Sequence, residues 1–271
     1  MARGWRYAAW AWAALLLLVF YAGPLLLIVL ASVAGQWNGA LPSHLTLIHY
    51  DQALTGDQSA SLGDSLATGA IASLVAMVLG TMAALALRGA GPVLRRVGGV
   101  AFYLPSAVPT VSVGLGLLVA YSRRPVLLNG TIAIVVLAHL AIVSAFAFGA
   151  VQAGLARLAP EFEEVAAGLG ARRAYLLRRV TLPLLAPYLG AAFNLAFALS
   201  MGELAATIMV YPPSWVTMPV SIFALTDRGD TFEGAALTVI LAAATLLVLG
   251  AVARVVTRAG APRSARDWTA Q

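Results

Sequence analysis

Residues 160–187 have the sequence PEFEEVAAGLGARRAYLLRRVTLPLLAP. It is a long charged run in a chain of 271 residues, of which 61% are apolar and only 10% are charged. Soluble domains carry roughly 25% charged residues, so most of this chain has lipid rather than water as its solvent. Because uncharged segments long enough to cross a bilayer flank the stretch on both sides, we interpret it as a connection outside the membrane.

The composition also excludes several function classes. The chain has no cysteine, and therefore no disulfide, no thiolate chemistry and no sulfur-ligated metal site. The formal net charge is +6, and every one of the 17 basic residues is arginine. These arginines lie at the ends of apolar segments, which indicates membrane topology rather than nucleic-acid binding. We expect neither a catalytic site nor a metal site in this chain.

Uncharged runs of about 20 residues locate the membrane-spanning helices. The first run is too long for the apolar core of a signal peptide, so we expect a retained helix. The connections are too short for a separate soluble domain. The sequence therefore predicts an all-α polytopic membrane protein, a single domain over residues 1–271. The six predicted spans are residues 7–33, 65–87, 97–122, 130–155, 184–209 and 234–253.

The arginines also predict the orientation, because short basic loops are disfavoured on the translocated side of a membrane. With a cytoplasmic N-terminus, 14 of the 17 arginines fall inside, so we predict that both termini are cytoplasmic. Residues 160–187 are then cytoplasmic, whereas residues 34–63 and 211–233 lie outside. The arginines predicted inside are Arg3, Arg6, Arg88, Arg95, Arg96, Arg157, Arg172, Arg173, Arg178, Arg179, Arg254, Arg258, Arg263 and Arg266, and those outside are Arg123, Arg124 and Arg228.

The opening stretch itself predicts a helix, a turn and a second helix at the membrane surface. Pro160 suits the first position of a helix, and the glutamates after it favour the positive end of the helix dipole. Gly170 can take the left-handed conformation that ends a helix, and a second helical piece starts at Arg172. On spacing alone, an ordinary basic loop that holds topology by its charge explains the segment equally well.

Residues 164–166 (Glu-Val-Ala), Gly170 and residues 180–183 (Val-Thr-Leu-Pro) resemble the E-A-A, G and hydrophobic-x-L-P signature of permease subunits in binding-protein-dependent ABC importers. Val165 departs from the usual first alanine. The resemblance implies the type I ABC permease fold, with a coupling loop over residues 157–183 that inserts into a groove on a cytoplasmic ATPase. The coupling residues are then Glu163, Glu164, Ala166, Ala167, Gly170, Leu182 and Pro183.

The same resemblance implies the partners of the chain. These are two cytoplasmic ABC ATPase subunits, a second permease subunit, identical or different, a periplasmic or lipid-anchored substrate-binding protein, and the lipid bilayer of the bacterial inner membrane, but no nucleic acid. The chain has no lysine, so it cannot form the nucleotide-binding motif G-x-x-x-x-G-K-[ST]. We therefore expect no enzyme activity and no cofactor in this chain, with ATP and Mg bound by the partner ATPase.

Polar residues and helix breaks at membrane depth are candidates for the translocation pathway, since polar groups there are costly and usually face protein or water. Glu203 is predicted in the outer half of the fifth helix, either facing the pathway or held in a bond to a neighbouring helix. Ser200 and Asn194 are further candidates, with interhelical hydrogen bonding favoured for both. Pro105 and Pro109 resemble the proline-broken third helix of the family, opening backbone groups toward the pathway or serving as a packing kink.

Other functions are less favoured. His139 is predicted to be a packing or hydrogen-bonding residue rather than a proton relay, and without a G-x-S-x-G partner it does not indicate a hydrolase. An ion-coupled carrier that uses Glu203 is the second hypothesis. Residues 201–229 look similar to permeases for 2-aminoethylphosphonate, and less closely to those for ferric iron, thiamine, polyamines, sulfate and molybdate.

Overall fold

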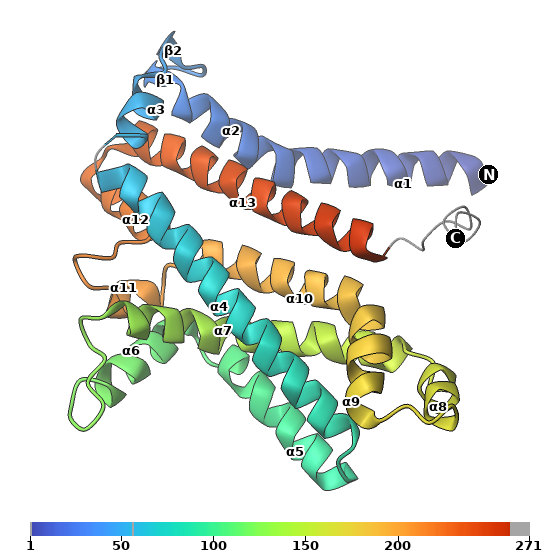
Figure 1. The fold of residues 1–271 in the computed structure, drawn as a ribbon. Helices are drawn as coiled ribbons and strands as arrows, with labels where there is room; N and C mark the ends of the chain where they lie inside the picture. The colour runs from blue at the N-terminus through green and yellow to red at the C-terminus, as the bar shows by residue number, and fades with distance from the viewer. Residues whose placement is uncertain (1, 56, 261–271) are drawn as a thin grey trace, which may run out of the picture. The chain divides into compact units, whose positions relative to one another are not determined.

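The computed structural model describes residues 2–55 and 57–260 (Figure 1). Arg263 and Arg266, which the topology prediction counts as cytoplasmic, lie outside the described residues. The chain forms two compact units. The smaller unit is Met1–Asp64 with Val216–Ala243, and the larger unit is Ser65–Trp215 with Ala244–Gln271.

Long apolar helices run through both units. A bent pair, Pro92–Ala107 followed by Thr110–Ala120, turns by 100° at its break. Counted as one broken span, the pair brings the candidate membrane spans in the described residues to six, which confirms the predicted polytopic helical fold. The unbroken helices that are long and apolar enough to cross a membrane are Trp5–Ser32, Gln58–Arg88, Ile132–Arg157, Arg173–Met201 and Thr231–Arg258.

The smaller unit packs around Ala53, Met218, Leu225 and Leu237. Its first long helix buries none of its most apolar window within the protein, as expected for a helix whose surroundings are lipid. The elements of this unit are α1 (Ala2–Leu17), a π-helical turn (Leu18–Ala22), α2 (Gly23–Ser32), β1 (Ala34–Gln36), β2 (Ser43–Leu45), α3 (Ile48–Ala53), the start of α4 (Asp57–Arg88), α12 (Met218–Arg228) and the first part of α13 (Thr231–Gly260).

A short two-stranded ladder joins β1 and β2. The strands are antiparallel, with Ala34 opposite Leu45 and Gln36 opposite Ser43. The ring of His49 holds the ladder against α3 through a 3.0 Å bond to the carbonyl of Ala34. Only helices were predicted from the sequence, because strands of three residues are too short to show an alternating pattern.

The larger unit packs around α7. Half of the most apolar window of α7 is buried, mainly against α10, which runs beside it in Figure 1. The ring of Phe148 lies at the centre of this core and stacks on Phe102 with ring centroids 4.6 Å apart. The elements are the rest of α4, α5 (Pro92–Tyr103), a 3-10 turn (Leu104–Ala107), α6 (Thr110–Ala120), α7 (Ile132–Arg157), α8 (Glu161–Gly168), α9 (Arg173–Leu176), a π-helical turn (Leu177–Thr181), α10 (Leu182–Met201), α11 (Thr207–Val210) and the end of α13.

The ends of two spans differ from the prediction in ways that matter for function. The third span begins at Pro92 instead of residue 97, because Pro92 occupies the first helical position of α5. The fifth span runs over Arg173–Met201 instead of residues 184–209. It starts earlier because the helix continues through Pro183, and it ends earlier because Gly202 caps α10.

Candidate functional site

The stretch that connects α7 to α10 is a helix, a turn and a second helix, as predicted. Pro160 immediately precedes α8, and three glutamates occupy its first turn, where they favour the positive end of the helix dipole. Gly170 has φ 85° and ends the helix. The amide of Gly170 bonds to the carbonyl of Ala167 at 2.9 Å, and the amide of Ala171 bonds to that of Ala166 at 3.1 Å. This pair of bonds is a Schellman motif, which confirms the predicted left-handed end of the helix at Gly170, called the elbow below.

The predicted coupling segment, α8 through α9, exposes large apolar side chains, both in α8 and its turn, which lie outside the candidate spans, and in α9, which begins the span Arg173–Met201. Leu169 is 85% exposed, and Phe162, Val165 and Tyr175 are each more than half exposed. A hollow of about 510 Å³ opens beside the elbow, lined by Ala166, Leu169, Gly170, Ala171, Arg172 and Tyr175. Exposed apolar surface of this kind marks places where a protein contacts another protein or a membrane.

Glu163, one of the residues that the resemblance assigns to coupling, is bonded within the chain. Its carboxylate Oε1 accepts a bond from Nη1 of Arg88 at 2.9 Å and another from Oγ1 of Thr181 at 2.9 Å. These three residues, the Glu163 clamp, tie α8 to the end of α4 and to the base of α10. The contact with Arg88 was not predicted, because Arg88 lies 75 residues away in the sequence. Glu164 and Ala167 stay exposed.

Leu182 and Pro183 lie where the π-helical turn passes into α10. The amide of Leu182 bonds to the carbonyl of Leu177, one residue further back than in an α-helix. This wider turn accommodates a proline that would otherwise clash with the preceding turn. The second half of the coupling segment and the fifth span are therefore one continuous helix of 29 residues, Arg173–Met201.

Pro105 and Pro109 lie at the break between α5 and α6, where the chain bends by 100°. Val108 between them is extended, so the helical bonding stops before α6 begins. Beyond the break, α6 runs close to the start of α11. A Cβ added to Gly114 would lie 2.6 Å from the carbonyl oxygen of Ala206, so only glycine permits this approach. The predicted break at Pro105 and Pro109 is confirmed.

The prediction that Glu203 lies in the outer half of the fifth helix is wrong, because α10 ends at Met201. Glu203 follows the capping residue Gly202 in a non-helical turn. Its carboxylate Oε1 accepts the backbone N–H of Ala206 at 2.7 Å, just before α11. This carboxylate therefore satisfies a free donor at a helix start, as a capping side chain does.

His139 lies buried in α7 and joins three helices. Its Nδ1 is 2.6 Å from Oγ of Ser200 in α10, and its Nε2 is 2.9 Å from Oγ1 of Thr207 in α11. Hydroxyls both donate and accept, so they satisfy the donor and the acceptor of a neutral imidazole. The predicted hydrogen-bonding role of His139 is confirmed. Thr207 was missed, because a single threonine gives no signal in a segment that was assigned to the fifth span.

Asn194 lies apart from this group. Its Nδ2 donates to the carbonyl of Leu249 in α13 at 3.3 Å, and its buried Oδ1 has no hydrogen-bond partner among the described residues. The structure therefore brings Ser200 and Glu203 together near His139 and Thr207, and it directs Asn194 toward another helix. Across residues 2–55 and 57–260, no group of three or more His, Cys, Asp or Glu residues could hold a metal ion.

Known proteins resemble this chain closely. A relative from Salmonella paratyphi A, provisionally named 2-aminoethylphosphonate transport system permease protein PhnV, is 50% identical over 255 residues, which covers 94% of this chain and 96% of that protein. The putrescine transport system permease protein PotI of Escherichia coli K12 is 29% identical over 241 residues, covering 86% of this chain and 83% of that one.

Solved structures share the fold. A bacterial alginate ABC transporter, in complex with an alginate pentasaccharide-bound periplasmic protein, has a chain that matches with a TM-score of 0.77 at 17% identity over 96% of both chains. The family model described as "Binding-protein-dependent transport system inner membrane component" matches residues 76–266. The chain therefore belongs to this family of bacterial inner-membrane proteins and is a permease subunit of a binding-protein-dependent ABC importer.

Proposed function

We propose that this permease subunit imports 2-aminoethylphosphonate, or a closely related small phosphonate, across the inner membrane. The observation that carries the proposal is the 50% identity over 94% of the chain to a relative that bears this substrate in its name. The putrescine relative, at 29% identity, is much more distant. An ion-coupled carrier was the alternative. That alternative rested on Glu203 alone, and the carboxylate of Glu203 accepts a hydrogen bond from the backbone N–H of Ala206.

The proposed assembly contains two cytoplasmic ATPase subunits, a second permease subunit and an external substrate-binding protein. The coupling segment supports an ATPase partner, because its apolar side chains are exposed next to a hollow of about 510 Å³. Small side chains at Ala166 and Ala167 allow close approach of a partner surface. ATP and Mg bind to that partner, and this chain supplies the docking surface and part of the pathway.

Closure of the ATPase subunits displaces α8, and two connections transmit this displacement to the membrane-spanning helices. The first is the Glu163 clamp, which joins α8 to Arg88 at the end of α4. The second is the unbroken helix from Arg173 to Met201, which carries motion of its base to the other end of α10. At that end of α10, the hydrogen bond between Ser200 and His139 transmits the motion to α7. The pathway opens or closes near the α5–α6 break and the turn that holds Glu203.

Uptake by proteoliposomes tests the proposal. The chain is purified with its co-expressed partner subunits, reconstituted with the binding protein, and given labelled 2-aminoethylphosphonate. We expect uptake that needs ATP, is blocked by vanadate, and is competed by other small phosphonates but not by putrescine. ATP-dependent uptake of putrescine without uptake of phosphonate would refute the substrate, whereas uptake driven by a proton gradient without ATP would refute the mechanism.

A further inference from the structure

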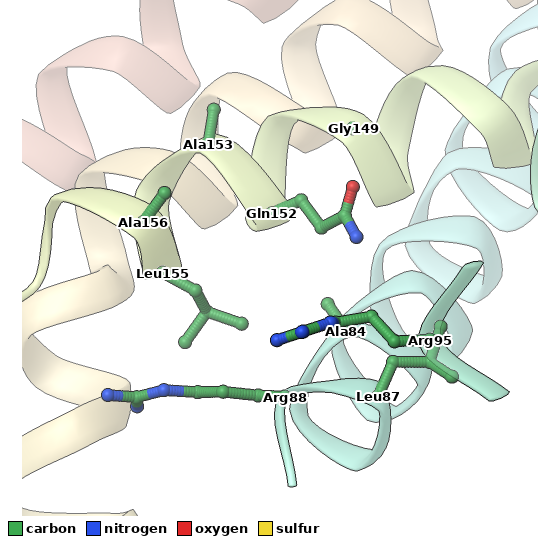
Figure 2. A pocket seen from close by; sticks show the side chains of 9 residues that line it. All are labelled: Ala84, Leu87, Arg88, Arg95, Gly149, Gln152, Ala153, Leu155 and Ala156. Atoms are coloured by element: carbon green, nitrogen blue, oxygen red, sulfur yellow. The ribbon is translucent and has the colours of Figure 1, made fainter. Parts of the chain in front are cut away.

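A pocket of about 550 Å³ lies between the end of α4, the start of α5 and the last turns of α7 (Figure 2). It is distinct from the residues assigned above to the pathway. Its walls are small or apolar, including Ala84, Leu87 and Leu155, and its polar groups are Arg88, Arg95 and Gln152. A pocket with apolar walls and a few convergent polar groups is the usual form of a ligand site.

The charge in this pocket is only partly compensated. Arg88 bonds to Glu163 at 2.9 Å, and in Figure 2 its guanidinium extends away from that of Arg95. Arg95 and Gln152 both turn into the pocket in Figure 2, and neither side chain has a hydrogen bond or ion pair in the described part of the chain. The pocket therefore keeps one unpaired positive charge, next to an amide that can donate.

We propose that this pocket binds a phosphate or phosphonate group, with Arg95 and Gln152 as its direct donors. A guanidinium presents its N–H groups as a fork that matches phosphate oxygens, and such charge-assisted bonds are about twice as strong as neutral ones. The apolar walls then contact the carbon part of the same molecule.

The location indicates two sources for such a group. Arg88 connects the rim of the pocket to α8, so the pocket lies at the same end of the spans as the coupling segment. Basic pockets between membrane helices on the cytoplasmic side receive the headgroups of anionic lipids. A small soluble phosphonate or phosphate offers the same oxygens. The site is chemically the same in both cases, and experiment separates the sources.

The first experiment measures lipid retention by native mass spectrometry on the full chain, purified with its partner subunits. Lipid-stripped protein is titrated with phosphatidylglycerol or with phosphatidylcholine. We expect phosphatidylglycerol to bind preferentially, and Arg95→Gln to weaken its binding about tenfold. Arg96→Gln is the matched control, because Arg96 is the next residue of α5 and does not line this pocket.

The second experiment titrates inorganic phosphate or 2-aminoethylphosphonate into the same lipid-stripped protein and follows displacement of phosphatidylglycerol. If a soluble anion displaces phosphatidylglycerol, and Arg95→Gln weakens this displacement, the site also binds soluble oxoanions. If neither anion displaces phosphatidylglycerol, the site binds lipid. Gln152→Leu, expected to weaken binding roughly fivefold, replaces Arg95→Gln if that variant does not fold. Equal binding of both lipids by all variants, without an effect of either soluble anion, would refute the site. These measurements need no transport, so their failure leaves the importer assignment intact.

Discussion

Glu203 lies in a non-helical turn between α10 and α11. A carboxylate in an apolar segment is costly, and hydropathy alone suggested that it faced the pathway or a helix neighbour. In the structure it accepts the N–H of Ala206 at 2.7 Å, after α10 has ended. Capping needs an acceptor oxygen, whereas contact with a cationic group of a substrate needs the negative charge. The two roles therefore respond differently to substitution.

Glu203→Gln keeps the acceptor oxygen and removes the charge, whereas Glu203→Ala removes both. We expect the free energy of unfolding of Glu203→Gln to stay within about 0.5 kcal/mol of that of the unmodified protein. We expect that of Glu203→Ala to fall by about 1 kcal/mol, the usual contribution of a capping side chain. Thermal unfolding of the purified complex measures both. If Glu203→Gln abolishes uptake while its stability is unchanged, the charge itself acts on the substrate and the capping role is not sufficient.

At the scale of elements, the coupling segment depends on the conformation at one glycine. Gly170 has φ 85°, a left-handed conformation that costs other residues roughly 1–2 kcal/mol. Gly168 is two residues earlier, within α8, and has an ordinary helical conformation. A Cβ at either position meets nothing within 4 Å. The two glycines therefore differ in backbone conformation and not in available space.

This difference makes Gly168→Ala a matched control for Gly170→Ala. We expect Gly170→Ala to weaken ATPase assembly or the coupling of ATP hydrolysis to uptake several-fold, because the elbow reorients. Gly168→Ala should leave both intact and favour α8 by about 0.5–1 kcal/mol. The ratio of ATP hydrolysed to substrate transported measures the coupling. Equal behaviour of the two variants would show that the elbow conformation is not needed.

The Glu163 clamp makes a second prediction at this scale. The Arg88 and Glu163 side chains are 35% and 22% exposed, so their ion pair should contribute less than about 1 kcal/mol to stability. Its proposed role is to transmit force. A double-mutant cycle with Glu163→Gln and Arg88→Gln should therefore show a small coupling energy in unfolding but a large, non-additive loss in ATP-coupled uptake. Additive losses in uptake would mean that the two residues act separately.

At the scale of the whole molecule, sequence predicted what depends on composition and local spacing. Uncharged runs located the six spans, and Pro105 with Pro109 marked the broken one. Gly170 was predicted as the elbow because only the local backbone is involved.

Contacts between distant segments could not be predicted in this way. Arg88 and Glu163 are 75 residues apart, and His139 lies 61 residues from Ser200 and 68 from Thr207. The sequence singles out most of these residues one at a time but does not indicate their partners, because packing alone brings them together. Helix ends were missed for a related reason, since hydropathy does not report where Gly202 stops α10.

The orientation of the whole chain rests on its arginines and can be tested because the protein has no cysteine of its own. Gly39→Cys and Gly91→Cys each place one thiol at an exposed position where an added Cβ meets nothing within 4 Å. The positive-inside count puts Gly39 outside and Gly91, between Arg88 and Arg95, in the cytoplasm. A membrane-impermeant maleimide should therefore label Gly39→Cys in cells whose inner membrane is intact, and Gly91→Cys only after that membrane is permeabilised. The reverse pattern would invert the topology and would place the coupling segment, joined to Arg88 through Glu163, on the side where no ATPase can reach it.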